Sequence, residues 1–327
     1  MNLTTDGLSG SGRVVVIGEV LVELSTREPF SGGAGMRLGF SGDALNAAAA
    51  AAAAGAHVVL VARVPDDELG AALVAYASGL GIDTSAVRRM PGQHGAYLIR
   101  ADPTGERQFV YLRRGSVGST LEPADLDEAL LHDTLVLTSG ITCAVSPTAA
   151  ATVRRAAEIA GGFVYDPNFR PRLTSVAKAA RALRDLAPRA RLVTPSWPGE
   201  ARALLDLPAD AGREAAAARV ERLGATAIAL TCGPDGVLLR EGSRETFVES
   251  PPAPRVVDQT GAGDSFVGTV AARLALGDDL ADAVRLGAAA ASLSVQGVGG
   301  TGFVPSLEQA RLHLARSFGT PTQAGPQ

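Results

Sequence analysis

The chain has 327 residues, of which 46% are hydrophobic, and a formal net charge of −4. This length and apolar content allow a large buried core, and without a basic stripe nucleic acid is not an expected partner. Segment 1–12 lacks the charged and apolar regions of a secretory signal, and the alanine run 47–54 is too short to span a membrane. The two cysteines, Cys143 and Cys232, are too few for a disulfide framework and are expected to be small core residues. These features predict a soluble protein of the reducing cytoplasm with no membrane partner.

The first part of the chain alternates β-branched or apolar runs with alanine-rich helical segments. A strand is expected at 13–18, followed by a strand at 19–24 that is wet on one face. Alanines over 43–54 predict a helix that can pack closely against a sheet. Strand 58–62 and helix 67–80 follow in the same alternation.

A change of pattern marks a small accessory element. Alternating runs at 96–100 and 108–113 flank the turn 102–105, which predicts a β-hairpin. Together with the earlier strand that is wet on one face, this hairpin is expected to form a small β lid from about 19–40 and 93–116.

The rest of the chain again alternates strands and helices. Nearly continuous apolar strands between helices predict a parallel sheet that is covered on both faces. Ligands bind beyond the carboxyl ends of the strands in such sheets. The strands are expected at 135–138, 163–165, 192–194 and 227–231, with helices at 146–160 and 213–223.

The most informative stretch is Val257–Phe266, which places Gly261, Ala262 and Gly263 just before a helix that we expect to begin at Asp264. Backbone N–H groups of small residues, at the positive end of a helix dipole, form a site for a phosphate. A carboxylate beside that site can take a proton from a hydroxyl, which is the equipment for phosphoryl transfer to an alcohol. The alternative is a plain glycine turn before an acidic helix start.

The longer string D-x-T-G-A-G-D-x-F, which begins at Asp258, resembles the second signature of the ribokinase-like, or PfkB, carbohydrate kinases. The resemblance covers roughly residues 13–315. It implies an α/β three-layer sandwich with a mostly parallel central sheet and a small β lid. A kinase domain at 13–318 with loose tails at 1–12 and 319–327 is the expected organisation.

The resemblance implies ATP-dependent phosphorylation of a sugar hydroxyl, with Asp264 as the catalytic base and Gly261–Gly263 as the anion hole. ATP and Mg²⁺ are the implied cofactors, and a requirement for a monovalent cation is left open. The turn after strand 227–231 lies along the nucleotide in this family, with a simple hairpin turn as the alternative. The implied nucleotide contacts are Thr231, Gly233 and Gly236.

The segment Ser41–Asn46 resembles the G-G-x-x-x-N signature of the same family, with Ser41 in place of the first glycine. Bare backbone at Gly42 would let a sugar lie against the chain, and Asn46 offers both a donor and an acceptor to hydroxyls. Asp43 fits two roles, as the N-cap of the following helix and as a sugar contact.

The dipeptide Gly18–Glu19 resembles 2-keto-3-deoxygluconate kinases and some fructokinases of this family. The lid segment Tyr111–Ser119 resembles the 2-keto-3-deoxygluconate kinases. In those enzymes lid tyrosines and an arginine face an acidic sugar, and an arginine can clamp a carboxylate with two hydrogen bonds. A solvated carboxylate and a water-exposed lid strand are the alternatives. The implied substrate contacts are Glu19, Tyr97, Tyr111 and Arg113.

Two further segments resemble the family pattern. Asp166–Arg170 resembles a D-x-N-x-R motif, in which Arg170 would contact the acid substrate or the transferred phosphate. A surface salt bridge is the alternative. The family's N-x-x-E motif is matched at Glu200, which implies an indirect, water-mediated contact with Mg²⁺. Trp197 stands where the family has asparagine.

The leading hypothesis is a 2-keto-3-deoxygluconate kinase of sugar metabolism. A fructokinase, another neutral-sugar kinase or a nucleoside kinase is the alternative, and a non-catalytic sugar sensor has Trp197 as its only support. A nicotinamide dehydrogenase is disfavoured because the opening strand lacks a G-x-G-x-x-G turn. Exposed edges of the lid strands predict a homodimer through the lid.

Overall fold

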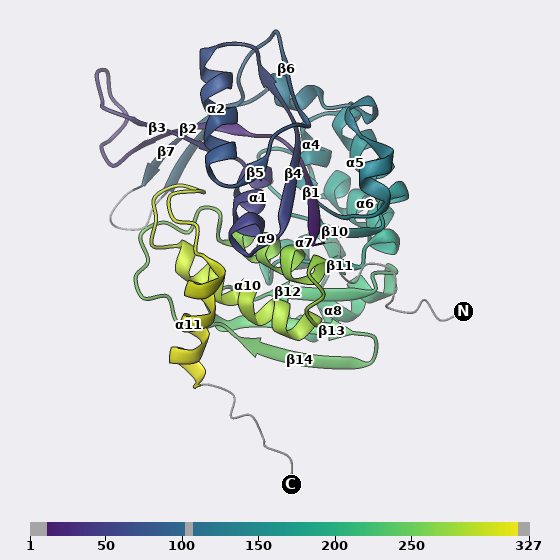
Figure 1. Cartoon of the computed structure of the whole chain (residues 1–327). Helices are drawn as coiled ribbons and strands as arrows, with labels where there is room; N and C mark the ends of the chain where they lie inside the picture. The colour runs from purple at the N-terminus through teal and green to yellow at the C-terminus, as the bar shows by residue number, and fades with distance from the viewer. Residues whose placement is uncertain (1–11, 102–106, 320–327) are drawn as a thin grey trace.

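The computed structural model describes residues 12–101 and 107–319 and contains two β-sheets with helices packed around the larger one (Figure 1). The predicted hairpin turn 102–105 and all but residues 12 and 319 of the expected tails lie outside the described residues. Strands β12 through β5 of the large sheet are parallel, and β13 and β14 extend it as an antiparallel hairpin. Its order is β14 (Arg244–Glu249), β13 (Gly236–Glu241), β12 (Ala227–Thr231), β11 (Leu192–Val193), β10 (Gly162–Asp166), β9 (Leu135–Ser139), β1 (Arg13–Ile17), β4 (His57–Pro65) and β5 (Ile82–Asp83), with β6 (Val87–Met90) also paired to β4.

Helices cover both faces of this sheet because its strands are apolar on both sides. Val14 and Val16 of β1 belong to one buried cluster, and Val15 and Ile17 belong to the other. The first cluster is closed by α1 (Asp43–Ala53), α2 (Glu68–Gly79), α9 (Ala262–Ala275) and α10 (Leu280–Ser294), with α11 (Leu307–Phe318) packed on α10. The second is closed mainly by α5 (Pro147–Ile159), α6 (Val176–Leu186), α7 (Gly199–Leu205) and α8 (Arg213–Arg222). The predicted three-layer α/β fold is confirmed.

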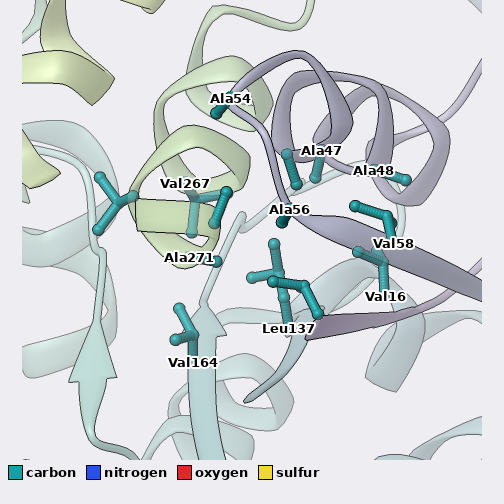
Figure 2. Close-up of a cluster of buried hydrophobic side chains, with 14 of the residues drawn as sticks. Val16, Ala47, Ala48, Ala54, Ala56, Val58, Leu137, Val164, Val267 and Ala271 are labelled. Carbon is teal, nitrogen blue, oxygen red and sulfur yellow. The ribbon is translucent and has the colours of Figure 1, made fainter. Parts of the chain in front are cut away.

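Helices α1 and α9 pack closely because small residues line their contact (Figure 2). Ala47 of α1 lies toward Val267 of α9, whereas Ala48 lies toward Val58 of β4 in the same cluster. At Gly268 of α9 a Cβ would overlap the backbone of Ala47, so no larger residue fits between the two helices as they stand. Close packing matters here because the amino ends of both helices carry residues of the predicted site.

The second sheet is the predicted β lid. It has the order β3 (Arg37–Ser41), β2 (Leu21–Thr26), β7 (Ala96–Ala101) and β8 (Arg107–Leu112). Strand β2 pairs in parallel with β7, and the other two pairings are antiparallel. Strand–strand pairing between β7 and β8 confirms the two arms of the predicted hairpin.

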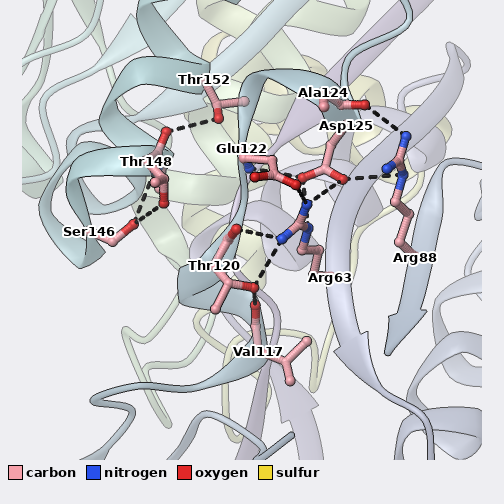
Figure 3. A network of polar contacts seen from close by, with 11 residues as sticks. Arg63, Arg88, Val117, Thr120, Glu122, Ala124, Asp125, Ser146, Thr148 and Thr152 are labelled. Carbon is pink, nitrogen blue, oxygen red and sulfur yellow. Dashed lines mark hydrogen bonds and ion pairs between the residues drawn. The ribbon is translucent and has the colours of Figure 1, made fainter. Parts of the chain in front are cut away.

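A buried ion-pair network fastens the segment after the lid to the large sheet (Figure 3). Arg63 of β4 pairs with Asp125 at 2.7 Å and donates a hydrogen bond to the carbonyl oxygen of Thr120 at 2.6 Å. Arg88 adds a second cation to Asp125, whose side chain is 1% exposed. The fastened segment contains η1 (Val117–Thr120) and η2 (Pro123–Asp125) and leads into α3 (Glu128–His132), with α4 (Gly140–Val145) following β9.

The start of α9 and the N-cap of α1 differ from the prediction. Helix α9 begins at Ala262, with Gly261 as its N-cap, so Asp264 lies in the first turn and does not begin the helix. Helix α1 has Gly42 as its N-cap, and the Asp43 carboxylate therefore does not cap it. In both cases a glycine with positive φ makes the turn into the helix, which frees the acidic side chain for other contacts.

Both cysteines carry free thiols; Cys232 is buried, whereas Cys143 is half-buried. Across residues 12–101 and 107–319, no helix is both long enough and apolar enough to cross a membrane.

Candidate active site

A cavity of about 870 Å³ opens between the carboxyl ends of the parallel strands, the amino end of α9 and the inner face of the lid. It brings together most of the predicted site residues, which come from segments far apart in the chain. Those lining it are Gly42, Asp43, Asn46, Tyr97, Tyr111, Arg113, Arg170, Glu200, Thr231, Gly261, Ala262, Gly263 and Asp264. Glu19, Gly233 and Gly236 are described by the structure but are not among the lining residues.

The Asp264 carboxylate is held by two asparagine side chains. Asn46 Nδ2 donates to Oδ2 at 2.8 Å, and Asn168 Nδ2 donates to Oδ1 at 3.3 Å. Ser41 Oγ donates in turn to Asn46 Oδ1 at 3.1 Å, which orients the amide. Asp264 is 9% exposed, so the carboxylate is fixed and largely removed from water.

The surroundings of Asp264 set its proton affinity. Burial is the largest effect and, with the Asp43 carboxylate, raises the pKa of Asp264 to about 6. The hydrogen bond from Asn46, the Arg170 guanidinium and the hydrogen bond from Asn168 oppose this rise in pKa. A carboxylate with this pKa is ionised at neutral pH and is a stronger base than an exposed aspartate, which suits proton abstraction from a hydroxyl.

The turn that leads into α9 lines the cavity with Gly261, Ala262 and Gly263. Gly261 has φ of +80°, and a Cβ there would lie 2.8 Å from the carbonyl oxygen of Gly300. A Cβ at Gly263 would meet open space, so the approach to the helix start is clear. Asp258 holds the turn by accepting the Thr260 N–H at 2.9 Å, and the Ala262 N–H donates to the Gln259 carbonyl at 3.2 Å. Together with the dipole of the fourteen-residue α9, this geometry fits a phosphate group.

Asp43 supplies a hydrogen-bond acceptor at the cavity. Its Oδ2 accepts a hydrogen bond from Ser139 Oγ. Its Oδ1 is buried and accepts no hydrogen bond from any residue that the structure describes. Burial raises the pKa of this carboxyl. A buried acceptor without a partner carries a desolvation cost, which a sugar hydroxyl in the cavity would relieve.

The lid contributes an arginine whose charge is already paired. Arg113 Nε donates to Glu19 Oε2 at 2.9 Å, and Arg113 Nη2 forms an ion pair with the same oxygen. Ser116 Oγ donates to Glu19 Oε1 at 2.6 Å. The side chain of Glu19 is fully buried, so Glu19 supports Arg113 and is not placed to touch a ligand in the cavity. Tyr97 and Tyr111 lie beside each other on the same wall, with ring centroids 6.3 Å apart.

The D-x-N-x-R segment after β10 forms the opposite wall. Asp166, Asn168 and Arg170 all line the cavity, and Asp166 Oδ1 accepts the Asn168 N–H at 3.1 Å. Glu200 accepts backbone N–H groups from Phe169 and, at 2.7 Å, from Ser196, so it ties this loop to the start of α7. Burial raises the pKa of both Asp166 and Glu200.

The donor set is compatible with Mg²⁺ only as an ion held chiefly by phosphate and water. Asp166 and Glu200 offer oxygens at the same cavity, whereas no group of three or more His, Cys, Asp or Glu side chains within residues 12–101 and 107–319 could hold a metal. Trp197 is not a lining residue; its ring packs 4.6 Å from the Arg202 guanidinium.

Three polar residues of the site were not identified from the sequence. Asn168 lies inside the D-x-N-x-R motif, and its position between the two charged residues is the signal that could have revealed it. Ser41 and Ser139 orient Asn46 and Asp43 from β3 and from the end of β9. Serines at strand ends carry no distinctive pattern, so these two contacts become visible only in the folded chain.

Comparison with known proteins agrees with this geometry. The pfkB family carbohydrate kinase model matches residues 11–307. A 2-dehydro-3-deoxygluconokinase from Thermoproteus tenax is 33% identical over 306 residues, which cover 91% of this chain and 92% of the relative.

Solved structures share the fold. A PfkB protein from Polaromonas superposes with a TM-score of 0.81 at 27% identity and covers 92% of this chain and 99% of its own. A ribokinase II from Escherichia coli, in complex with ATP and Mg²⁺, superposes with a TM-score of 0.83 at 24% identity and covers 94% and 100%. The chain therefore belongs to the PfkB family and is a carbohydrate kinase, a phosphotransferase.

Proposed function

We propose that this kinase phosphorylates 2-keto-3-deoxygluconate with ATP as the phosphoryl donor. The observation that carries the proposal is the buried Asp264 carboxylate beside the anion hole of α9, in a cavity whose walls also bear Arg113 and Arg170. The Thermoproteus tenax relative, which is named for this substrate, supports the choice of sugar. Because ATP is the donor, we place the reaction in the cytoplasm.

The proposed chemistry begins at the sugar hydroxyl. Asp264 accepts the hydroxyl proton as the oxygen bonds to the γ-phosphorus of ATP, while the bond from that phosphorus to the β,γ-bridging oxygen breaks and ADP leaves. The N–H groups of the Gly261–Gly263 turn stabilise the charge on the transferred group. Asn46 and Asn168 hold the base in place, and the unpartnered Oδ1 of Asp43 accepts a hydrogen bond from the sugar.

The nucleotide is proposed to bind at the end of β12 and along the turn that follows it. Thr231 lines the cavity at the end of β12, and we propose that it contacts the nucleotide phosphates. Gly233 and Gly236 extend this side along the turn beyond the cavity. Mg²⁺ bound with ATP would neutralise phosphate charge, with Glu200 reaching it through water. A monovalent-cation requirement stays a prediction.

Two arginines are proposed to recognise the acid group of the sugar. Arg113 uses Nε and Nη2 to hold Glu19, which leaves Nη1 for the substrate carboxylate. Arg170 is exposed at the opposite wall. Tyr97 and Tyr111 complete the sugar-facing wall of the lid. A neutral sugar, such as fructose, would offer no anion to Arg170 or to Nη1 of Arg113, although Arg113 would keep its ion pair with Glu19. This favours the acid sugar.

A coupled ADP-release assay tests the assignment. Purified protein with Mg-ATP is offered 2-keto-3-deoxygluconate, fructose, ribose and a nucleoside. Turnover confined to the keto-deoxy acid is the expected result. Turnover with fructose alone would retain the base and the anion hole but would refute the carboxylate role of Arg113.

We also propose that residues 13–318 act as one kinase domain that dimerises through its lid. Residues Leu38, Leu24, Leu98 and Val110 face one another across the four lid strands in a single row. Leu38 is 52% exposed and Val110 is 42% exposed, and Leu112 of β8 is 56% exposed on the same face. An apolar sheet face of this kind is suited to a second copy of the chain.

A further inference from the structure

A turn at residues 299–301 lies between the lid, the Gly261–Gly263 turn before α9 and the side chains that hold Asp264. Thr301 Oγ1 donates to the Phe40 carbonyl of β3 at 2.8 Å and contacts Tyr76 Oη of α2 at 2.9 Å. The turn therefore has fixed partners on the lid and on the large domain. The proposed chemistry assigns no role to these contacts.

Glu23 connects this turn to the sugar wall. It lies on β2, is 5% exposed, and its Oε2 accepts hydrogen bonds from Tyr97 Oη and, at 3.4 Å, from the Gly300 N–H. A Cβ at Gly299 would overlap the same carboxylate, so the turn lies directly against it. Tyr97 itself lines the cavity, which makes Glu23 the link between a cavity residue and the turn.

The other side of the turn contacts the phosphate site. Asp258 accepts the Gly299 N–H at 2.9 Å through Oδ2, and through Oδ1 it accepts the Thr260 N–H at 2.9 Å. A Cβ at Gly261 would lie 2.8 Å from the Gly300 carbonyl oxygen. The backbone of Gly300 thus supports the N-cap of α9, where the anion hole begins.

Gly300 also packs against the two residues that hold Asp264, the proposed base. A Cβ at Gly300 would overlap both the side-chain amide of Asn46 and the hydroxyl of Ser41. Asn46 holds Asp264, and Ser41 orients Asn46. A shift of Gly300 would therefore displace the anion hole and the partner of the base together.

We propose that Glu23 is a positioning residue that couples the Tyr97 wall of the sugar site to the anion hole and to Asn46 through Gly300. A sugar against Tyr97 fixes the Glu23 carboxylate, which fixes the turn and so completes the phosphate site. Sugar and nucleotide then bind with positive coupling, and each raises the affinity of the other by the same factor. The inference rests on the proposed sugar contact of Tyr97.

Two substitutions can show whether Glu23 acts as a hydrogen-bond acceptor or through its negative charge. Both donors, Tyr97 Oη and the Gly300 N–H, reach the same oxygen of Glu23. A glutamine whose amide oxygen takes that place can accept both bonds, whereas methionine fills a similar volume and can accept neither. Glu23→Gln and Glu23→Met therefore form a matched pair.

The test measures kcat, the sugar KM, and the nucleotide Kd with and without sugar, using the sugar that the wild-type enzyme turns over. Glu23→Met is expected to lower kcat about 10- to 100-fold and to abolish the coupling, and to raise the sugar KM at saturating nucleotide by no more than the coupling factor of the wild type. Glu23→Gln is expected to stay within about threefold of wild type in all three quantities. Which sugar the wild type accepts tests the proposed function separately.

Several results would overturn the proposal. Wild-type nucleotide affinity that is indifferent to sugar would remove the coupling itself. A Glu23→Met enzyme that lost sugar affinity but kept kcat would show that Glu23 acts only on sugar binding and not on the anion hole. Equal losses in Glu23→Gln and Glu23→Met would show that hydrogen-bond acceptance is not the operative property.

Two further variants guard against general destabilisation. Asp125→Asn removes another buried acid, in the Arg63 network outside the cavity, and is expected to lower thermal stability with kcat and coupling unchanged (Figure 3). Loss of coupling in that variant would assign the effect to stability. If Glu23→Met does not fold, Tyr97→Phe removes one hydrogen bond onto Glu23 and is expected to weaken the coupling. Unchanged coupling in Tyr97→Phe would contradict the route through Tyr97.

Discussion

Asn46 and Asp264 stand 218 positions apart in the chain, yet the amide of the first donates to the carboxylate of the second at 2.8 Å. The contact exists because α1 and α9 lie side by side with their amino ends at the same cavity. It opposes the rise in pKa that burial imposes on Asp264. The basicity of the proposed catalytic group is thus set by how two helices pack.

The pH dependence of activity follows from the pKa of Asp264. Only the ionised carboxylate can accept the hydroxyl proton, and its pKa is about 6. We expect kcat/KM to fall tenfold per pH unit well below pH 6 and to level off above pH 7. A pH–rate profile in Mg-ATP checks this, and a rate that stays flat down to pH 5 would contradict the role of Asp264.

Replacing Asp43 should move that profile. Its carboxylate raises the pKa of Asp264, so Asp43→Asn is expected to lower the midpoint of the kcat/KM profile by about half to one pH unit. The sugar KM should rise as well. The asparagine side chain has one acceptor oxygen in place of two, and Ser139 Oγ already donates to this side chain. An unchanged midpoint would show that the two carboxylates do not interact.

Asp264→Asn should separate chemistry from stability. We expect kcat to fall by about 10³-fold or more while the Kd for the sugar changes little. The raised pKa means that the folded protein binds the Asp264 proton more tightly than the unfolded chain, so this group's stabilising contribution is present below pH 4 and lost as pH rises through about 6.

At pH 8 the buried, ionised Asp264 therefore lowers the free energy of unfolding of the wild-type protein. Asparagine removes this charge but makes a weaker contact with Asn168. We expect Asp264→Asn to be more stable than wild type by about 1 kcal/mol at pH 8 and to lose this advantage at pH 4. Chemical denaturation at the two pH values measures the difference. A variant that was less stable at pH 8 would contradict the raised pKa.

The Glu19–Arg113 pair calls for a double variant. Arg113→Met leaves the Glu19 carboxylate buried without its cation and should cost about 3 kcal/mol of unfolding free energy. Adding Glu19→Gln should restore most of that stability but not the affinity for the acid sugar. Denaturation and the sugar KM of both variants separate the two roles. Recovery of KM in the double variant would show that Arg113 does not bind the substrate.

The proposed dimer predicts a concentration-dependent mass. Leu38→Lys with Leu112→Lys places charges on the exposed lid face and should give a monomer in light scattering at micromolar concentration. The fold of the large domain should be unaffected, as circular dichroism would show. A wild-type protein that is already monomeric under these conditions would refute the dimer.

Local motifs explain which parts of the site could be predicted. The phosphate turn and Asp264 are adjacent in sequence, so one string predicts that they share a helix start. Glu19 could not be placed in this way, because its pairing with Arg113 depends on how the lid meets the end of β1. The contacts of Gly300 with Asn46 and Ser41 could not be predicted either, since the sequence around a glycine does not indicate what packs against it.

Helix boundaries were less predictable than helix positions. The alanines of α1 and the apolar face of α9 predict both helices, and α1 begins at Asp43 as expected. The glycine N-caps Gly42 and Gly261 were not predicted, and α9 begins two residues before Asp264. Aspartate is a common N-cap, which is why Asp43 was given that role beside its role as a sugar contact. Asp43 and Asp264 both line the cavity.

The contact between Ala47 and Gly268 carries a constraint that reaches beyond packing. Any side chain added at Gly268 must push α9 away from α1, and Asn46 and Asp264 would separate with the helices. Position 268 lies among alanines and carries no reactive group, yet we expect it to tolerate substitution as poorly as Asp264, the proposed catalytic base. We therefore expect few substitutions at position 268 among natural variants of this enzyme, because the small residues between α1 and α9 keep Asn46 and Asp264 in contact.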